Sequence, residues 1–146
     1  MDTSPPHDKE NPVSDIFEGY TEVKKEVLAI ETRKAAYKLF SVAGVLLIFN
    51  LIAVIASGIP LSYVLLDILI FPVVFVGLGL LAFKEPMVAT ILGMVIIFGL
   101  WIYNAVVVDM VTLTQGWLGK AIVIYLLFAG MQNAREAHRV KQELKG

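Results

Sequence analysis

Four polar side chains inside otherwise apolar segments are the residues of this chain that could do chemistry: Asn50, Asp67, Asn104 and Lys120. The Asp67 carboxylate and the Lys120 ammonium group can form an ion pair, and both asparagine amides can donate and accept hydrogen bonds. Counted from the ends of the predicted segments at about 1.5 Å per residue, all four lie about 5 to 10 Å below the same boundary. We therefore predict one polar layer to which each segment contributes one group.

This polar layer has three interpretations. An ionised aspartate at the centre of a bilayer costs about 2.5–3.5 kcal/mol, and less near the interface, so Asp67 is expected to find a partner such as Lys120. The four groups can bind neighbouring helices together, they can line an outward-facing polar pocket, or their placements can be unrelated. Pro72 is expected to free a carbonyl near Ile68 and to bend its helix.

Other chemistry is missing from the sequence. The absence of cysteine excludes disulfide scaffolds, iron–sulfur clusters and thiol catalysis. No HExxH, GxSxG, P-loop or dinucleotide-binding motif is present. Neither His7 nor His138 lies in an apolar segment, which excludes a haem held by two histidines of the spans. We predict no catalytic residue, no cofactor and no metal site, and a protein that is not an enzyme.

The elements that carry the polar layer follow from composition and charge. Apolar residues make up 58% of the chain and charged residues 17%, which is too apolar for a soluble domain and argues against nucleic-acid binding. Between residues 39 and 134 only five residues are charged. Glycine, proline and charged residues divide this block into four predicted spans, at about 39–57, 61–83, 86–108 and 117–134. Backbone groups in lipid must bond within a helix, so the predicted fold is all-α: an integral membrane four-helix transmembrane bundle with an N-terminal amphipathic helix.

The distribution of charge predicts the orientation. Both tails and the turn at Lys84 carry 11 of the 12 basic residues, and only Lys120 lies on the opposite side. Because positive residues favour the cytoplasmic side, we expect a multi-pass protein, in a bacterial cytoplasmic membrane, with both termini in the cytoplasm.

The two tails differ in pattern. Residues 1–14 are rich in proline and are predicted to be disordered, whereas residues 15–38 are predicted to form a juxtamembrane helix that starts at an Asp15–Glu18 capping pair. Residues 135–146 are predicted to continue the fourth helix as a cytoplasmic tail. The helix at 15–38 carries one apolar stripe with spacings of four and three, formed by Ile16, Tyr20, Val23, Val27 and Ile30. This stripe can lie on the membrane surface, pair with a copy or a partner helix, or remain solvated.

Short motifs in the second half of the chain carry a resemblance. They are AFKEP at 82–86, ILGMV at 91–95 and GMQNAREA at 130–137. In these motifs the chain resembles a group of small bacterial four-helix membrane proteins with no assigned activity. The resemblance implies a bacterial origin and four spans, and it implies no function.

Two classes of function follow. The first is a non-enzymatic interaction or scaffold subunit of a membrane assembly, whose partners are the lipid bilayer and a membrane protein or further copies of itself. The second is a small oligomeric transporter or channel that uses the polar layer around Asp67. The amphipathic helix favours the first class.

Overall fold

The computed structural model describes residues 12–58, 60–107 and 116–145, and, within these, no side chains of residues 12–15, 61–64 and 67. The described residues contain no strand, which confirms the all-helical prediction. The four helices are α1 (Pro12–Ser57), α2 (Leu61–Ala82), α3 (Pro86–Val107) and α4 (Trp117–Glu143). Two of these helices are long and apolar enough to cross a membrane: α1, in its part Ile16–Ser57, and α3, Pro86–Val107.

Local backbone chemistry sets the helix ends. Gly58 follows α1 with a φ of 68°, a left-handed conformation that ends a helix and that glycine adopts without a steric penalty. The turn between α2 and α3 is tight, because the Lys84 and Glu85 amides both donate to the carbonyl of Leu81. Pro86 then opens α3 at a position where a missing N–H costs no hydrogen bond.

The first helix is longer than the sequence pattern predicted. It begins at Pro12, three residues before the start predicted at Asp15, and so includes residues 12–14 of the tail predicted to be disordered; residues 1–11 lie outside the described part of the chain. Proline suits a first helical position because its φ is already helical. The predicted juxtamembrane helix and the first predicted span form one continuous helix of 46 residues.

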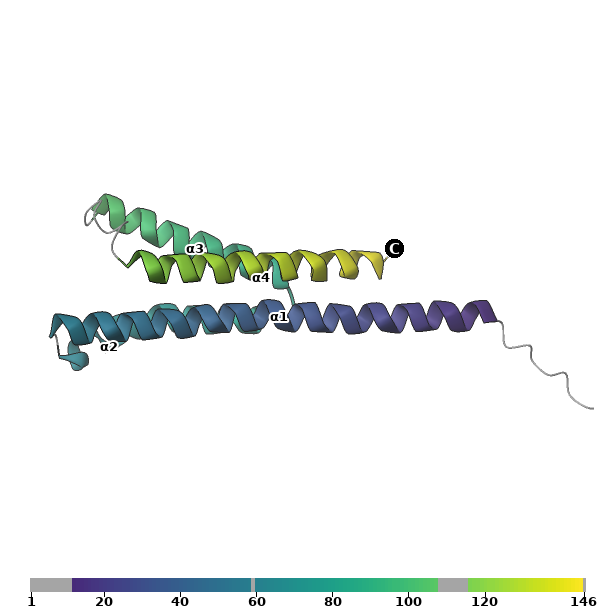
Figure 1. Cartoon of the computed structure of the whole chain (residues 1–146), viewed down its shortest axis with the longest axis horizontal. Coiled ribbons are helices and arrows are strands. Elements are labelled where there is room, and N and C mark those ends of the chain that lie inside the picture. The colour runs from purple at the N-terminus through teal and green to yellow at the C-terminus, as the bar shows by residue number, and fades with distance from the viewer. Residues whose placement is uncertain (1–11, 59, 108–115, 146) are drawn as a thin grey trace, which may run out of the picture.

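Helix α1 is the central element of the bundle. Its most extensive contacts are with α4 and α2, and Figure 1 shows it running along the whole length of the molecule. The core contains fully buried side chains from all four helices, among them Leu39, Phe75, Ile97 and Leu127. The packing is close at the α1–α2 contact, where a Cβ added to Gly79 would lie 2.6 Å from the Phe40 ring.

The end of α4 extends along α1. Figure 1 shows the two helices side by side up to the C-terminal end, beyond which α1 continues alone. Lys24 of α1 and Glu143 of α4 form a salt bridge of 2.9 Å at this end. The residues of α1 before Lys24 therefore project past the end of α4.

Candidate functional site

Two residues of the predicted polar layer, Asn50 and Lys120, lie near the end of the bundle where α1 ends and α4 begins, which we call the loop end. Asn50 on α1 is half-buried, and its side-chain Nδ2 donates to the carbonyl of Ile68 on α2 over 3.4 Å. That carbonyl lies four residues before Pro72, which has no N–H to bond it within the helix. The asparagine therefore bonds the carbonyl that the proline frees, and this bond joins α1 to α2.

Lys120 lies in the first turn of α4 and is half-buried. Its Nζ is 5.8 Å from the centroid of the Trp101 ring on α3, within the range of a cation–π contact. Asn50, Trp101 and Lys120 line one cleft of about 330 Å³ at the loop end. The cleft sits where α1 approaches the start of α4, at the buried Gly119.

Only two of the four predicted residues are brought together among the described side chains. Asn50 and Lys120 share the loop-end cleft, whereas Asn104 is half-buried on α3 and is not among the described residues that line it. The Asp67 backbone belongs to α2, but its side chain lies outside the described residues. The Asp67–Lys120 pair and the complete polar layer therefore stay predictions.

The apolar stripe on α1 faces away from the rest of the chain. All five members are exposed, from 71% at Ile16 to 39% at Val27. The face of α1 that packs into the bundle includes the buried residues Ala35 and Leu39. This face lies about a third of a turn around the helix from the stripe. The stripe is thus not part of the contact between α1 and α4.

Ion pairs hold the opposite end of the bundle together. Lys141 of α4 donates to the Glu85 carboxylate over 2.6 Å, which ties α4 to the turn between α2 and α3. The hydrogen bond from Lys141 keeps the pKa of Glu85 below its ordinary value. In the same way the bond from Lys24 lowers the pKa of Glu143, and the bond to Glu143 raises the pKa of Lys24.

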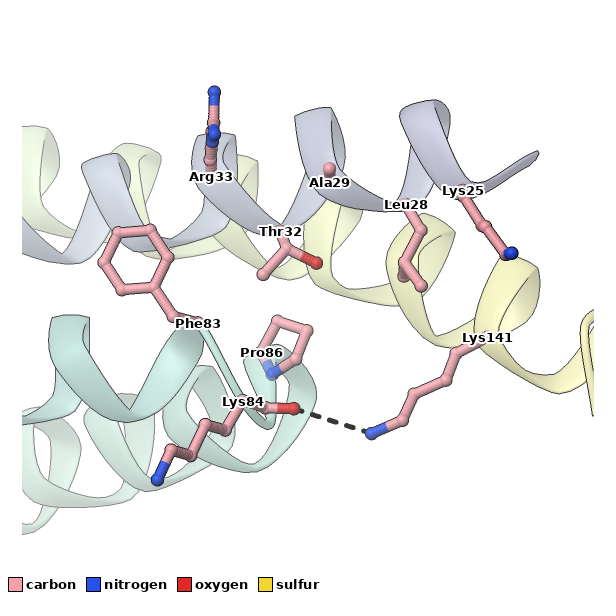
Figure 2. A pocket seen from close by; sticks show the side chains of 9 residues that line it. All are labelled: Lys25, Leu28, Ala29, Thr32, Arg33, Phe83, Lys84, Pro86 and Lys141. Atoms are coloured by element: carbon pink, nitrogen blue, oxygen red, sulfur yellow. Dashed lines mark hydrogen bonds between the residues drawn. The ribbon is translucent and has the colours of Figure 1, made fainter. Parts of the chain in front are cut away.

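A second cleft, of about 310 Å³, opens at this end between α1, the α2–α3 turn and α4. We call it the basic cleft, because four of its lining residues are basic: Lys25, Arg33, Lys84 and Lys141. Its other lining residues are Leu28, Ala29, Thr32, Phe83 and Pro86 (Figure 2). Sequence reasoning missed this cleft, because its basic residues come from three distant segments and each looks like an ordinary cytoplasmic flank. Their shared position beside the predicted inner boundary was the available signal.

Within the described part of the chain, no group of three or more histidine, cysteine, aspartate or glutamate residues is placed to hold a metal ion. No family model, curated protein or solved structure matches this sequence. The resemblance to small bacterial four-helix membrane proteins therefore stays a prediction.

Proposed function

We propose that this chain is a non-enzymatic, four-span membrane protein that acts as an interaction subunit of a membrane assembly. The observation that carries the proposal is the exposed apolar stripe on α1, whose first three residues, Ile16, Tyr20 and Val23, lie on the projecting part of that helix. The proposal has three parts, which are the membrane placement, the availability of the stripe and the kind of partner.

The membrane placement is supported by where the apolar side chains lie. In the two helices long enough to span, 17% and 22% of the most apolar window is buried inside the protein, whereas the core helix of a soluble protein would be mostly buried. Ile55, Leu66 and Val106 are each at least 75% exposed. Lipid, but not water, accommodates so many outward-facing apolar groups. Helices α2 and α4 complete the four spans, with both termini in the cytoplasm as the basic residues favour.

The length of α1 leaves the stripe outside the membrane. A helix of 46 residues is about 69 Å long, and the hydrocarbon core of a bilayer is about 30 Å thick. About 40 Å of α1 therefore extends into the cytoplasm, and only its inner part is covered by α4. The remaining surface combines an apolar stripe with charged flanks, which is the pattern of a helix that packs against another helix.

The flanking charges favour a partner of a different sequence. Two copies in one membrane would align their cytoplasmic helices in parallel, and the four–three spacing then sets Glu26 of one copy opposite Glu31 of the second. This contact brings like charges together, which disfavours self-pairing. We therefore propose a partner helix that carries the opposite charges at these positions.

Co-purification from native membranes followed by mass spectrometry tests this function. We expect one membrane protein to accompany the wild type and the Glu22→Lys variant, whose change lies on another face of α1. The same protein is expected to be lost from the Val23→Glu variant, which places a charge in the stripe. Recovery of the lone chain in all three preparations, or retention of the partner by Val23→Glu, would contradict the proposal.

The loop-end cleft favours one alternative, a small oligomeric transporter or channel. Its support is that Asn50 and Lys120 line a common cleft between helices. Transport measured in reconstituted vesicles with the Asp67→Asn variant separates the two functions. A loss of flux in a correctly folded variant supports the alternative, and unchanged flux removes its main argument.

A further inference from the structure

We propose that the basic cleft is a binding site for the phosphate headgroup of an anionic phospholipid in the inner leaflet. This inference rests on the membrane placement proposed above, but not on the partner helix.

The charges of the cleft favour an anion. Four of its nine lining residues are basic, and none of the described residues that line it is acidic. Glu85 is paired with Lys141, through the contact of 2.6 Å. The other three basic residues, Lys25, Arg33 and Lys84, come from α1 and the α2–α3 turn, and Figure 2 shows the Arg33 and Lys84 side chains extending outward at the rim of the cleft. A phosphodiester is the inner-leaflet anion that these basic groups attract most directly.

The shape and the other lining residues favour a lipid over a free ion. Leu28, Phe83 and Pro86 give the cleft apolar walls beside its charged rim. In Figure 2 Thr32 points from α1 into the space between that helix and Pro86, and its hydroxyl can donate to a phosphate oxygen. An amphiphile, with a charged head and an apolar stem, satisfies both kinds of surface at once.

The depth of the cleft also matches a headgroup. Lys84 lies in the turn that joins α2 to α3, and Pro86 opens α3, so this turn marks the membrane boundary in the proposed topology. Because α1 and α4 pass the turn and continue into the cytoplasm, the cleft between them and the turn lies at the level of the lipid headgroups in the proposed topology. Basic pockets between helices at this level are suited to anionic lipids.

Native mass spectrometry of the detergent-solubilised full chain, with added phosphatidylglycerol or phosphatidylcholine, tests the inference. We expect phosphatidylglycerol to bind at least about tenfold more tightly than phosphatidylcholine. The triple variant Lys25→Gln, Arg33→Gln, Lys84→Gln leaves the Lys141–Glu85 pair intact and is expected to lose about ten- to a hundredfold in affinity for phosphatidylglycerol. The charge-conserving triple variant Lys25→Arg, Arg33→Lys, Lys84→Arg is expected to keep most of it.

A matched control removes three positive charges elsewhere, through Lys34→Gln, Arg135→Gln and Arg139→Gln. We expect this control to bind phosphatidylglycerol like the wild type, and inorganic phosphate at millimolar concentration not to compete. Equal binding of the two lipids, an equal loss in both triple variants, or displacement of the lipid by inorganic phosphate would each overturn the inference. Circular dichroism of every variant shows whether the helices are intact. Failure here leaves the partner-helix proposal standing, because the stripe and the cleft use different faces of α1.

Discussion

Replacing Gly79 by alanine tests the close contact between α1 and α2. The added Cβ would lie 2.6, 2.8 and 2.9 Å from three carbon atoms of the Phe40 ring. Ordinary contacts begin at 3.4 Å, so the ring would have to move by about 0.8 Å or α2 would have to shift. The ring packs against Phe83, with 6.3 Å between the two centroids, which limits its movement. Overpacking of this kind costs about 1–3 kcal/mol.

The matched control is Gly77→Ala on the same helix, where an added Cβ meets nothing within 4 Å. Both substitutions gain the same helix propensity, about 0.8–1.0 kcal/mol, so this gain cancels when the two variants are compared. We expect Gly79→Ala to be less stable than Gly77→Ala by about 1–3 kcal/mol. Unfolding in mixed micelles with increasing sodium dodecyl sulfate, followed by circular dichroism, measures the difference.

A second substitution locates the cause. The Phe40→Leu change removes the ring, so adding Gly79→Ala to it should cost little, and the double-mutant cycle should show a coupling energy of about 1 kcal/mol or more. Equal stability of the two alanine variants would refute the packing of α1 against α2 described above, and the absence of coupling would refute the role of the ring.

Three further predictions concern the polar contacts and the orientation. Asn50→Leu is expected to destabilise the bundle by about 0.6–1.7 kcal/mol. The cost should be smaller in a Pro72→Ala background, because residue 72 then has an N–H that can donate to the Ile68 carbonyl. Equal costs in both backgrounds would contradict the hydrogen bond from Asn50 to the freed carbonyl. The hydrogen bond from Lys141 lowers the pKa of Glu85. The bond therefore stabilises the fold at pH values above the ordinary pKa of glutamate, and this stabilisation is lost as the pH falls through the lowered pKa. Lys141→Ala should therefore raise the midpoint of the Glu85 carboxyl titration by NMR, and an unchanged midpoint would argue against the pair. In this cysteine-free chain, Ser57→Cys should react with an impermeant thiol reagent from outside intact cells and Glu85→Cys only after permeabilisation; the reverse pattern would invert the proposed topology.

The helix ends at Gly58 and Pro86 follow from local chemistry, whereas the start of α1 at Pro12 differs from the start predicted at Asp15. Gly58 and Pro86 act through their own backbone conformations, and their effects do not depend on distant residues. The face of α1 that packs into the bundle was harder to predict. It includes the fully buried Ala35 and Ala36, and α4 buries Ala134 and Ala137 as well. Small side chains let helices approach closely but give a weak apolar signal, so the larger residues of the stripe dominate the pattern.

The two clefts show a second limit of sequence reasoning. The freed carbonyl of Ile68 follows from the position of Pro72, yet its bond to Asn50 depends on how α1 and α2 are aligned. The basic cleft likewise depends on contacts between helices distant in sequence. Residue types identify candidate groups, and only the alignment of the helices decides which of them meet.

The most direct test of the proposed function is site-specific photo-crosslinking in native membranes. A photoreactive phenylalanine analogue replaces Val23 in the stripe, and in a parallel preparation it replaces Glu22, which is exposed on another face of α1. We predict that the probe at position 23 forms a covalent adduct with one membrane protein, while the probe at position 22 does not. Adducts of position 23 with lipid alone, or the same adducts from both positions, would contradict a partner helix on the stripe.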